Sequence, residues 1–519
     1  MPDLPTPVPA QRERRPSSAR GAFTLMGGTL ASRASGLLRE VLLVALFPVR
    51  ASDAFRLAWT VPNLFRELLA EGALTNAFIP IYQRLRGDDR RDFAGAMTAV
   101  LALVNGVLIA LALAVAPGIV DLLLAPGANV DRDLAVQLLR ITFPVLGAIS
   151  LSALAMGVLN AEERFLAPAW APVAMNVVAI AVMVAAPGQA MALAWGVVAG
   201  GLAQAAVQWP AMRRAGVMPR LGGIWHAAMP MTLALMAPFA FTTGARQFLN
   251  VVAQRIVSDA SLFPPGAVTA YALSAMLFSL ALGLFAISPA IAYFSRLGNV
   301  VEEGGDAFRE TLEAGVRFIV VLTVPAGLAL FAFADPSVRV LFAFLRPAAG
   351  QETSIALAVL ALAPLGLALA PAGLVNFLLR PFFVRRRVLA PVAMSVAFTV
   401  ATAALFVAFA PRYGIAGLSW ATALAMGLHT VVLVGWLARS EGLAVRAVAW
   451  HALRVSLAAA LAVGAARLVA TAAVGALPVE GWFASFAELA MGGAVIVPLY
   501  ASLGLAMGVL RPAWFRRAG

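Results

Sequence analysis

The sequence predicts an all-α integral membrane protein with about fourteen transmembrane helices: two parallel-repeat six-helix lobes plus two C-terminal helices. Three observations predict this fold: the hydrophobic composition, the distribution of arginine and an internal repeat. Of the 519 residues, 62% are hydrophobic, only 12% are charged, and the mean hydropathy is +0.89. A soluble protein of this size cannot bury so much apolar surface. The composition therefore excludes a soluble enzyme, a disordered chain and a nucleic-acid-binding module.

Hydrophobic runs long enough to cross a bilayer follow one another through the whole chain. Each run reaches the roughly 20 residues that a hydrocarbon core requires in a window of about 19 residues. In chain order, the predicted spans cover residues 22–47, 53–83, 93–118, 133–160, 167–187, 190–212, 226–258, 266–295, 307–334, 352–379, 388–410, 414–438, 448–474 and 482–510. The first run is too long for a signal peptide and carries two arginines, so we predict that it is a transmembrane helix.

Arginine alternates between the segments that connect these spans. It is frequent in the N-terminal tail, in every second loop and at the C-terminus, and scarce in the other loops. The rich segments hold Arg12, Arg14, Arg15, Arg20, Arg84, Arg86, Arg90, Arg91, Arg213, Arg214, Arg220, Arg380, Arg385, Arg386, Arg387, Arg511, Arg516 and Arg517. By the positive-inside rule, both termini are cytoplasmic, which requires an even number of spans.

An internal repeat relates two blocks of six spans. The segment Ala171–Asn176 recurs as Ala390–Ser395, and Leu193–Trp195 recurs as Leu418–Trp420, at offsets of 219 and 225 residues. A shift by six spans preserves the direction of each helix, so the two lobes run parallel, as in many transporters. The predicted organisation is a disordered basic tail (1–21), an N-lobe (22–215), a C-lobe (225–440), two added helices (446–510) and a second cytoplasmic tail (511–519).

The amino-acid inventory excludes several chemistries. All 38 basic residues are arginine, so a phosphate-binding loop with its lysine and a Schiff-base lysine are both absent. Cysteine is absent as well, and His226, His429 and His451 lie far apart in sequence. No pattern of a nucleophile with its base, or of metal ligands, occurs. We therefore predict a protein that is not an enzyme and has neither a cofactor nor a bound catalytic metal.

Polar side chains inside the first two spans indicate a binding site. An arginine at the centre of a membrane helix costs roughly 2.5–3.5 kcal/mol to insert, which marks it as functional or paired. The candidates are Arg33 and Arg39 in the first span and Asp53, Asn63, Arg66 and Glu71 in the second. One helical stripe of the second span holds Arg56, Asn63, Glu67 and Glu71, with Asp53 beside it and Arg66 on its flank.

Two interpretations fit these residues. The side chains could pair with one another across the helices, as in Arg66 with Glu71 or Arg39 with Asp53. Alternatively, at least two of the arginines face a solvated anion, since guanidinium groups bind a diphosphate or a carboxylate bidentately and stay charged when partly buried. The second interpretation is favoured, and Arg246 and Arg255 in the seventh span could complete the site from the other lobe.

The residues around these arginines resemble a known family. The stretches that carry the resemblance are Ser32-Arg33-Ala-Ser-Gly36-Leu-Leu-Arg39-Glu40, Asp53-Ala54-Phe55, Pro62-Asn63-Leu64-Phe65-Arg66 and Ala70-Glu71-Gly72-Ala73. Further matches are Gly157-Val-Leu-Asn160, Ala171-Pro172-x-x-x-Asn176, Leu193-Ala194-Trp195-Gly196 and Tyr413-Gly414-Ile415-Ala416-Gly417-Leu418. Together they resemble the MurJ (MviN) lipid II flippases of the multidrug/oligosaccharidyl-lipid/polysaccharide exporter superfamily, over residues 22 to 510.

The resemblance implies a function and a site. It implies a bacterial inner-membrane flippase that moves lipid-linked peptidoglycan precursor by alternating access, with helices thirteen and fourteen holding the polyprenyl tail. Arg33, Arg39 and Arg66 match the family's cavity arginines, and Asp53, Asn63 and Glu71 match its supporting polar positions. The implied drive is the membrane potential or a coupling ion of unknown identity. Implied partners are the lipid precursor, membrane lipids and cell-wall synthesis proteins.

One departure from the family keeps alternatives open. The family's eighth span usually reads Tyr-Ala-Asp-Arg-Leu-Met-Glu, whereas this chain has Tyr271-Ala-Leu-Ser274-Ala-Met-Leu277. Either Arg246 or Arg255 replaces the arginine missing at Ser274, or the cargo or gating differs. The alternatives are a flippase for another polyprenyl-diphosphate oligosaccharide, a drug exporter of the same superfamily, and a membrane scaffold that transports nothing.

Overall fold

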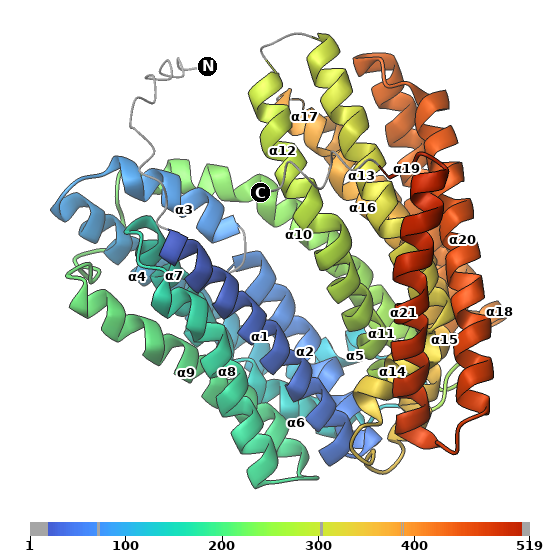
Figure 1. Ribbon diagram of the computed structural model, residues 1–519. Coiled ribbons are helices and arrows are strands. Elements are labelled where there is room, and N and C mark those ends of the chain that lie inside the picture. The colour runs from blue at the N-terminus through green and yellow to red at the C-terminus, as the bar shows by residue number, and fades with distance from the viewer. Residues whose placement is uncertain (1–18, 70–72, 302–304, 386, 388, 511–519) are drawn as a thin grey trace.

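The computed structural model describes residues 19–69, 73–301, 305–385, 387 and 389–510. Within these ranges the regular secondary structure is helical, and Figure 1 shows the helices running side by side in two groups, α1–α9 and α10–α21. We call residues 19–214 the first half and residues 229–441 the second half. The all-α multi-pass architecture predicted from the sequence is confirmed.

The helices have the following bounds. The first half contains α1 (Ala19–Leu46), α2 (Val49–Leu69), α3 (Ala73–Arg84), α4 (Asp88–Ala114), α5 (Ala116–Leu123), α6 (Arg132–Thr142), α7 (Val145–Ala161), α8 (Leu166–Ala185) and α9 (Ala190–Arg214). The second half contains α10 (Met229–Val257), α11 (Ala267–Leu282), the π-helix η1 (Gly283–Ile287), α12 (Ser288–Val300), α13 (Gly305–Ala332), α14 (Ala334–Phe342), α15 (Gln351–Leu367), α16 (Leu369–Leu378), α17 (Arg380–Val384), α18 (Leu389–Tyr413) and α19 (Ile415–Glu441). Helices α20 (Val445–Gly475) and α21 (Gly481–Ala506) follow.

The helices are built from alanine and leucine runs, and local chemistry fixes where they begin. Asp131 caps α6, because its carboxylate accepts a hydrogen bond of 3.0 Å from the backbone N–H of Leu134. Gly266 precedes α11 with a φ of 102°, a left-handed conformation that glycine adopts without steric cost. These two starts lie in the loops that join the two halves of the molecule, so they also position the contacts described below.

The packing of the two halves follows one scheme. In the first half, α8 packs against α9 and α1, α2 packs against α6, and α4 packs against α7. In the second half, α18 packs in the same way against α19 and α10, α11 against α15, and α13 against α15 and α16. Because the repeated segments Ala171–Asn176 and Ala390–Ser395 lie on α8 and α18, the sequence repeat and the packing repeat coincide.

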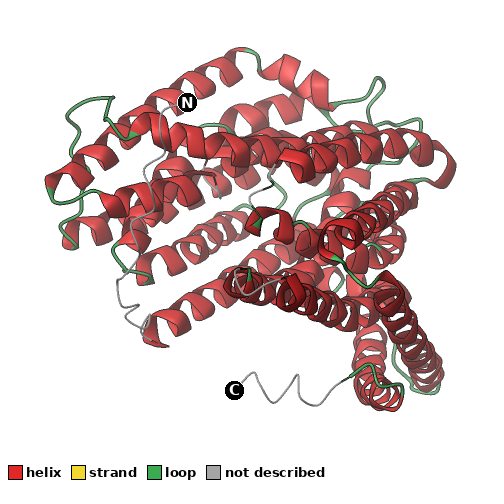
Figure 2. Cartoon of the chain, turned by 90° about the horizontal axis from the view of Figure 1, so that it is seen from above, coloured by secondary structure: helices red, strands yellow, loops and turns green. Residues whose placement is uncertain are grey.

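The last two helices form a pair on the outside of the second half. Helix α20 packs against α13 and α21, and Figure 2 shows the pair projecting at the edge of the molecule. Tyr500 donates a 2.9 Å hydrogen bond to the carbonyl oxygen of Val321, and the indole N–H of Trp482 donates one of 2.8 Å to Val340. Exposed leucines line the outer face of α20, as expected of a helix surface that contacts lipid.

The number of apolar helices is lower than the predicted number of spans. Among the described residues, ten helices are long and apolar enough to cross a membrane, or eleven if the pair Gln351–Leu367 and Leu369–Val384, bent by 49°, is one span. The difference of three from the predicted fourteen lies in α1, α2 and α10, which have 21 to 29 residues. These helices carry the arginines and acidic or amide residues singled out above, and those side chains lower their hydropathy.

At one end of the molecule the two halves are joined by loop contacts. We call this the joined end; it contains the α1–α2 turn and the loops before α6, α11 and α15. The backbone N–H of Ala348 donates to Val44 and that of Val49 to Ala349, each at 3.0 Å. The backbone N–H of Asn129 donates a hydrogen bond of 2.8 Å to the carbonyl oxygen of Ser258. In Figure 1 the joined end is the lower one, opposite α3 and α12.

Candidate functional site

A cluster of charged side chains occupies the contact between α1, α2 and α8. Arg39 donates one hydrogen bond of 3.0 Å to Glu40 and another of 3.2 Å to the side-chain oxygen of Asn176. Arg56 donates to the second carboxylate oxygen of Glu40 at 2.7 Å. The Glu40 side chain is only 13% exposed, so one carboxylate balances two guanidinium groups in a largely buried setting. We call Arg39, Glu40, Arg56 and Asn176 the arginine cluster.

Asn176 holds this cluster against α1. Its amide nitrogen donates to the carbonyl oxygen of Ser32 at 3.2 Å and to the hydroxyl of Ser35 at 3.1 Å. With its oxygen engaged by Arg39, the Asn176 side chain therefore ties three residues of α1 to α8. Asn176 and Glu40 belong to the motifs quoted above, but their part in the site follows only from the fold.

A second polar chain connects α2 to α10. Arg66 donates to the side-chain oxygen of Asn63 from Nε at 3.0 Å and from Nη2 at 2.9 Å. Asn63 in turn donates to Glu67 at 3.1 Å, and Glu67 accepts a hydrogen bond from Gln247 of α10. Two predicted site residues, Asn63 and Arg66, thus lie together at the contact between the halves. Glu71 lies outside the described residues.

Arg33 faces the second half. Its side chain is exposed, and its guanidinium lies against Gly283, the first residue of η1. A β-carbon at Gly283 would lie 3.0 Å from Nη1 and 3.2 Å from Nη2 of Arg33, so the glycine permits this close approach. π-Helical turns are rare and frequent at functional sites. Arg33 is therefore a charged group that reaches from one half toward the other.

Asp53 has a different environment from the arginines. It is 1% exposed, and its carboxylate accepts hydrogen bonds from the backbone N–H of Gly266 at 2.6 Å and from the backbone N–H and hydroxyl of Thr269 at 2.9 and 2.6 Å. These groups form the N-terminus of α11, where a carboxylate is favoured by the free N–H groups and the helix dipole. The side-chain amide of Gln351 also stabilises the joined end, since it donates hydrogen bonds to the carbonyl oxygen of Phe47 at 3.0 Å and to the hydroxyl of Ser52 at 2.7 Å.

Arg255 also lies at the joined end, away from the arginine cluster. Its guanidinium donates to the carbonyl oxygens of Asp121, Leu122 and Leu124 at 3.3, 2.9 and 2.8 Å. These carbonyls belong to the C-terminal end of α5, which lacks helical partners of its own and attracts a cation. The side chain of Arg246 lies outside the described part of the chain.

Ser274 is buried within the second half. It is 1% exposed, and its hydroxyl donates a 2.9 Å hydrogen bond to the carbonyl oxygen of Tyr271 in its own helix. The position at which the family's eighth span carries an arginine therefore holds a small side chain whose hydroxyl is hydrogen-bonded within its own helix.

Outside the apolar helices, the backbone N–H of Leu134 and the guanidinium of Arg50 hold the pKa of Asp131 below its usual range, against the opposing effect of partial burial.

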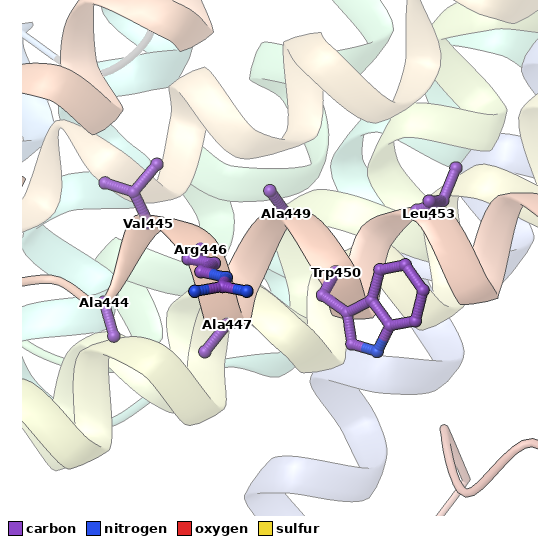
Figure 3. Close-up of a pocket in the computed structure, with 7 residues that line it drawn as sticks. All are labelled: Ala444, Val445, Arg446, Ala447, Ala449, Trp450 and Leu453. Carbon is purple, nitrogen blue, oxygen red and sulfur yellow. The ribbon is translucent and has the colours of Figure 1, made fainter.

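A groove at the start of α20 has features of a membrane interface. Figure 3 shows its lining residues, which all lie between Ala444 and Leu453, with the Arg446 guanidinium and the Trp450 indole among them. Trp450 is 58% exposed and Leu453 57% exposed. Tryptophan and arginine commonly mark the level of the lipid headgroups. None of the predicted site residues lines this groove.

Comparisons with known proteins agree with this architecture. The family model described as lipid II flippase MurJ matches residues 44–487. The chain is 32% identical to a Burkholderia cenocepacia protein named lipid II flippase MurJ, over 80% of this chain and 82% of the relative. It is also 32% identical to a Rhizobium meliloti protein named probable lipid II flippase MurJ, over 79% and 78%.

Solved structures share the fold. One titled lipid II flippase MurJ, inward closed conformation, has a TM-score of 0.77 at 20% identity and covers 93% of this chain and 99% of that one. An inward-facing multidrug resistance transporter of the MATE family has a TM-score of 0.62 at 15% identity and covers 79% and 97%. The family model covers most of this chain and the curated relatives are about 30% identical over four fifths of it, so the chain belongs to the MurJ lipid II flippase family.

Proposed function

We propose that this protein flips lipid II, the lipid-linked peptidoglycan precursor, from the cytoplasmic to the periplasmic leaflet of the bacterial inner membrane. Relatives that share about 30% of its residues over most of its length carry that name. The observation in the chain itself that supports the proposal is the set of arginines held inside the helices of the first half. A diphosphate carries the negative charge that such guanidinium groups bind.

The different surroundings of the arginines support different roles for them in binding the cargo. Arg39 and Arg56 share the carboxylate of Glu40, so they are neutralised in part and fixed in position. Arg33 is exposed and lies at the boundary with the second half. We infer that Arg33 makes the first contact with the diphosphate, and that Arg39 and Arg66, oriented by Asn176 and Asn63, complete the anion site.

The joined end supports an alternating-access cycle. From the positive-inside rule we infer that this end faces the periplasm, since α1 begins after the arginine-rich tail and ends there. We infer that Asp53 and Arg255, which hold loops of both halves together, belong to a periplasmic closure that must open to release cargo. In this proposal the two lobes, residues 22–215 and 225–440, move against each other, and helices 446–510 contact the polyprenyl tail.

The test is replacement of the flippase in a bacterium depleted of its own. The wild-type chain is expected to restore growth and to expose lipid II at the periplasmic face, measured by labelling or by cleavage from outside. Arg33→Ala, Arg39→Ala and Arg66→Ala are each expected to reduce that exposure at least about tenfold, because each removes a charge-assisted contact of 1.5–3 kcal/mol. Arg412→Ala, at an exposed arginine near the end of α18, is the matched control and should leave exposure unchanged.

A cargo with a different headgroup is the second candidate, and the buried Ser274 favours it. Without a charged residue there, the second half contributes fewer groups to a peptide or sugar headgroup than the family pattern provides. This candidate would be supported if the protein is expressed normally in the membrane, does not restore growth, and transports another polyprenyl-diphosphate oligosaccharide in vesicles. That oligosaccharide lipid would then be the cargo in place of lipid II. Failure to move any such lipid would identify a membrane scaffold. Docking of cell-wall synthesis proteins is an accompanying proposal, tested by co-purification.

A further inference from the structure

The segment that joins the two halves along the chain is fastened to the first half. We call residues 215–228, between α9 and α10, the connector. The backbone N–H of Arg220 donates a 3.0 Å hydrogen bond to the carbonyl oxygen of Arg91, and the guanidinium of Arg91 donates one of 3.2 Å to the carbonyl oxygen of Met218. Arg220 also forms an ion pair with Asp88 at 2.8 Å. The connector is thus held on the first turns of α4.

Gly95 allows the connector to lie directly on α4. An added β-carbon at Gly95 would lie 1.7 Å from the carbonyl oxygen of Arg220, so any other residue there would push the connector away. We therefore expect the connector to move together with the first half. Only two alanines separate His226, its last residue bound to α4, from Met229, the first residue of α10. A movement of the second half must be absorbed in this short stretch or by bending of α10.

The imidazole of His226 contacts both halves through its two ring nitrogens. Nε2 lies 3.0 Å from a carboxylate oxygen of Asp89, in the first turn of α4. Nδ1 accepts a 3.1 Å hydrogen bond from the backbone N–H of Ala228, the residue that precedes α10. The ring also lies on Phe93 with centroids 5.3 Å apart, and the side chain is 13% exposed. One side chain therefore fixes the start of α10 relative to α4.

These two contacts require a neutral imidazole with its proton on Nε2. Nδ1 accepts a hydrogen bond from Ala228, so it carries no proton, and Nε2 is then the N–H that donates to Asp89. A second proton would convert Nδ1 into a donor that faces the N–H of Ala228. The contact with Asp89 would remain and become charge-assisted, whereas the contact with the start of α10 would be lost. Protonation thus frees the second half from His226 and leaves the imidazole on the first half.

The charges around the ring act in opposite directions on a proton. The titratable and charged residues of the elements packed around His226 and Phe93 are Asp88, Asp89, Arg90, Arg91 and Asp92 of α4, Arg220 of the connector, Tyr82 and Arg84 of α3, and Glu162 after α7, which pairs with Arg90. Helix α10 carries no charged residue before Arg246. The N-terminal ends of α4 and α10 disfavour a cation between them, whereas the carboxylate of Asp89 favours it. Asp89 is therefore the group that stabilises the protonated ring.

We propose that His226 is a pH-sensitive clamp between the halves, at the end of the molecule opposite the joined end, where α10 begins beside α3 (Figure 1). The neutral imidazole holds the start of α10 against α4. The protonated imidazole releases α10, so the halves separate more readily at this end. The regulation rests on the proposed flippase function, and under the proposed orientation this end faces the cytoplasm. Histidine changes its charge between about pH 5 and 8, so the clamp responds to acidification of the cytoplasm.

The first experiment measures the separation of the halves and needs no cargo. The chain has no cysteine, so spin labels attached at Gln83→Cys of α3 and Asn299→Cys of α12, both exposed, report the distance across this end of the full-length protein in nanodiscs. From about pH 7.5 to about pH 5.5, across the range in which histidine titrates, the population with the longer distance is expected to rise at least about threefold, the effect of losing one hydrogen bond. His226→Gln cannot take up a proton and should give one distribution at both pH values.

Two further variants control for the other histidines and for folding. His451→Gln, at a buried histidine of α20, is the matched control and should keep the wild-type response. His226→Ala removes both contacts at every pH, so its distribution should match that of the acidified wild type throughout. Identical wild-type distributions at the two pH values overturn the proposal, and so does a pH response that His226→Gln retains.

The second experiment measures transport in proteoliposomes that contain lipid II, with the same pH on both sides so that no gradient is present. The wild-type flipping rate is expected to differ at least about threefold between the two pH values, again the effect of one hydrogen bond. The rate of His226→Gln should differ less than that of His451→Gln. An equal pH dependence in these two variants overturns the regulatory role of the clamp. A pH-dependent distance between the spin labels without any lipid II transport would instead contradict the cargo assignment alone.

Discussion

The two halves of this protein share one packing scheme and differ in charge. In the first half, the contact between α1, α2 and α8 holds Arg39, Glu40 and Arg56 around Asn176. In the second half, the corresponding region around Ser395 is an accessible pocket without a charged side chain in its described wall. The comparison shows that the helix packing does not itself demand the charges. They are specific to the first half, which is where an anionic cargo would be bound.

The difference also shows how a membrane protein stabilises buried arginines. A charged side chain inside a bilayer persists when it is paired or faces a water-filled cavity. Glu40 accepts hydrogen bonds from two arginines at once, and the neutral side-chain oxygens of Asn176 and Asn63 accept from Arg39 and Arg66. Neutral partners orient a guanidinium without cancelling its charge. The first half therefore keeps positive charge available, and the second half avoids the need for such partners.

Introducing an arginine into the second half should have the largest effect. Ser274→Arg places a long cation at a site that is 1% exposed, without a carboxylate among the described residues that bond to Ser274. We expect a loss of about 4 kcal/mol, from the insertion penalty and from overpacking. Thermal unfolding of the purified protein measures this. Ser274→Ala is the control and should be near neutral. A stable Ser274→Arg protein with faster flipping would show that the second half can accept the family's charge.

Removing the charge that joins the halves should have the next largest effect. Asp53→Asn replaces one carboxylate oxygen, which accepts a hydrogen bond, with an NH₂ group, which can only donate. One of the hydrogen bonds from the backbone N–H groups of Gly266 and Thr269 is therefore lost. We expect the joined end to be destabilised by about 2 kcal/mol, the cost of an unsatisfied buried group.

Cysteine labelling measures that opening cleanly, because the chain has no cysteine of its own. A cysteine introduced at Ser52, which is buried at the joined end, should react faster in the Asp53→Asn background. Asp121→Asn, at an exposed carboxylate that pairs with Arg132, is the control. Equal labelling rates in all backgrounds would show that Asp53 does not hold this end closed.

The matched pair Asn176→Ala and Ser395→Ala tests the repeat directly and should have the smallest effects. Asn176→Ala removes contacts to Arg39, Ser32 and Ser35, and we expect it to lower stability by about 1–2 kcal/mol. Ser395→Ala removes one bond within its own helix, and we expect less than about 0.5 kcal/mol. Denaturation of the two variants in the same detergent gives the comparison. Similar losses would mean that the two positions are equally structural.

The membrane class and the repeat could be predicted from sequence, because they depend on local composition and spacing. Three long helices, α1, α2 and α10, are too polar for a hydropathy criterion, and the regular alternation of arginines reveals them instead. The suggested pair of Arg39 with Asp53 shows the limit of that reasoning, whereas the pair of Arg66 with Glu71 stays a prediction because Glu71 lies outside the described residues. Arg39 in fact pairs with its neighbour Glu40, and Asp53 binds residues more than two hundred positions away.

The reason for this limit is physical. Spacing on one helix shows which side chains share a face, but not which helix packs against that face. Arg255 illustrates the point, because its partners are backbone carbonyls of α5, which every sequence supplies. The clamp at His226 was equally hidden, since a histidine without local metal-ligand spacing gives no signal until the fold places Asp89 and Phe93 beside it. Long-range contacts with backbone groups are invisible in a single sequence.

The contact of Asp53 with α11 has a consequence for how this protein can vary. Two of its three donors are main-chain N–H groups, so a change of side chain at Thr269 leaves the backbone donor there in place, short of introducing proline. Gly266 differs, because its φ of 102° strains any other residue and an added β-carbon would lie 2.7 Å from the hydroxyl of Ser354. A genetic selection for variants that open more readily should therefore recover changes at Asp53 and Gly266 more often than at Thr269.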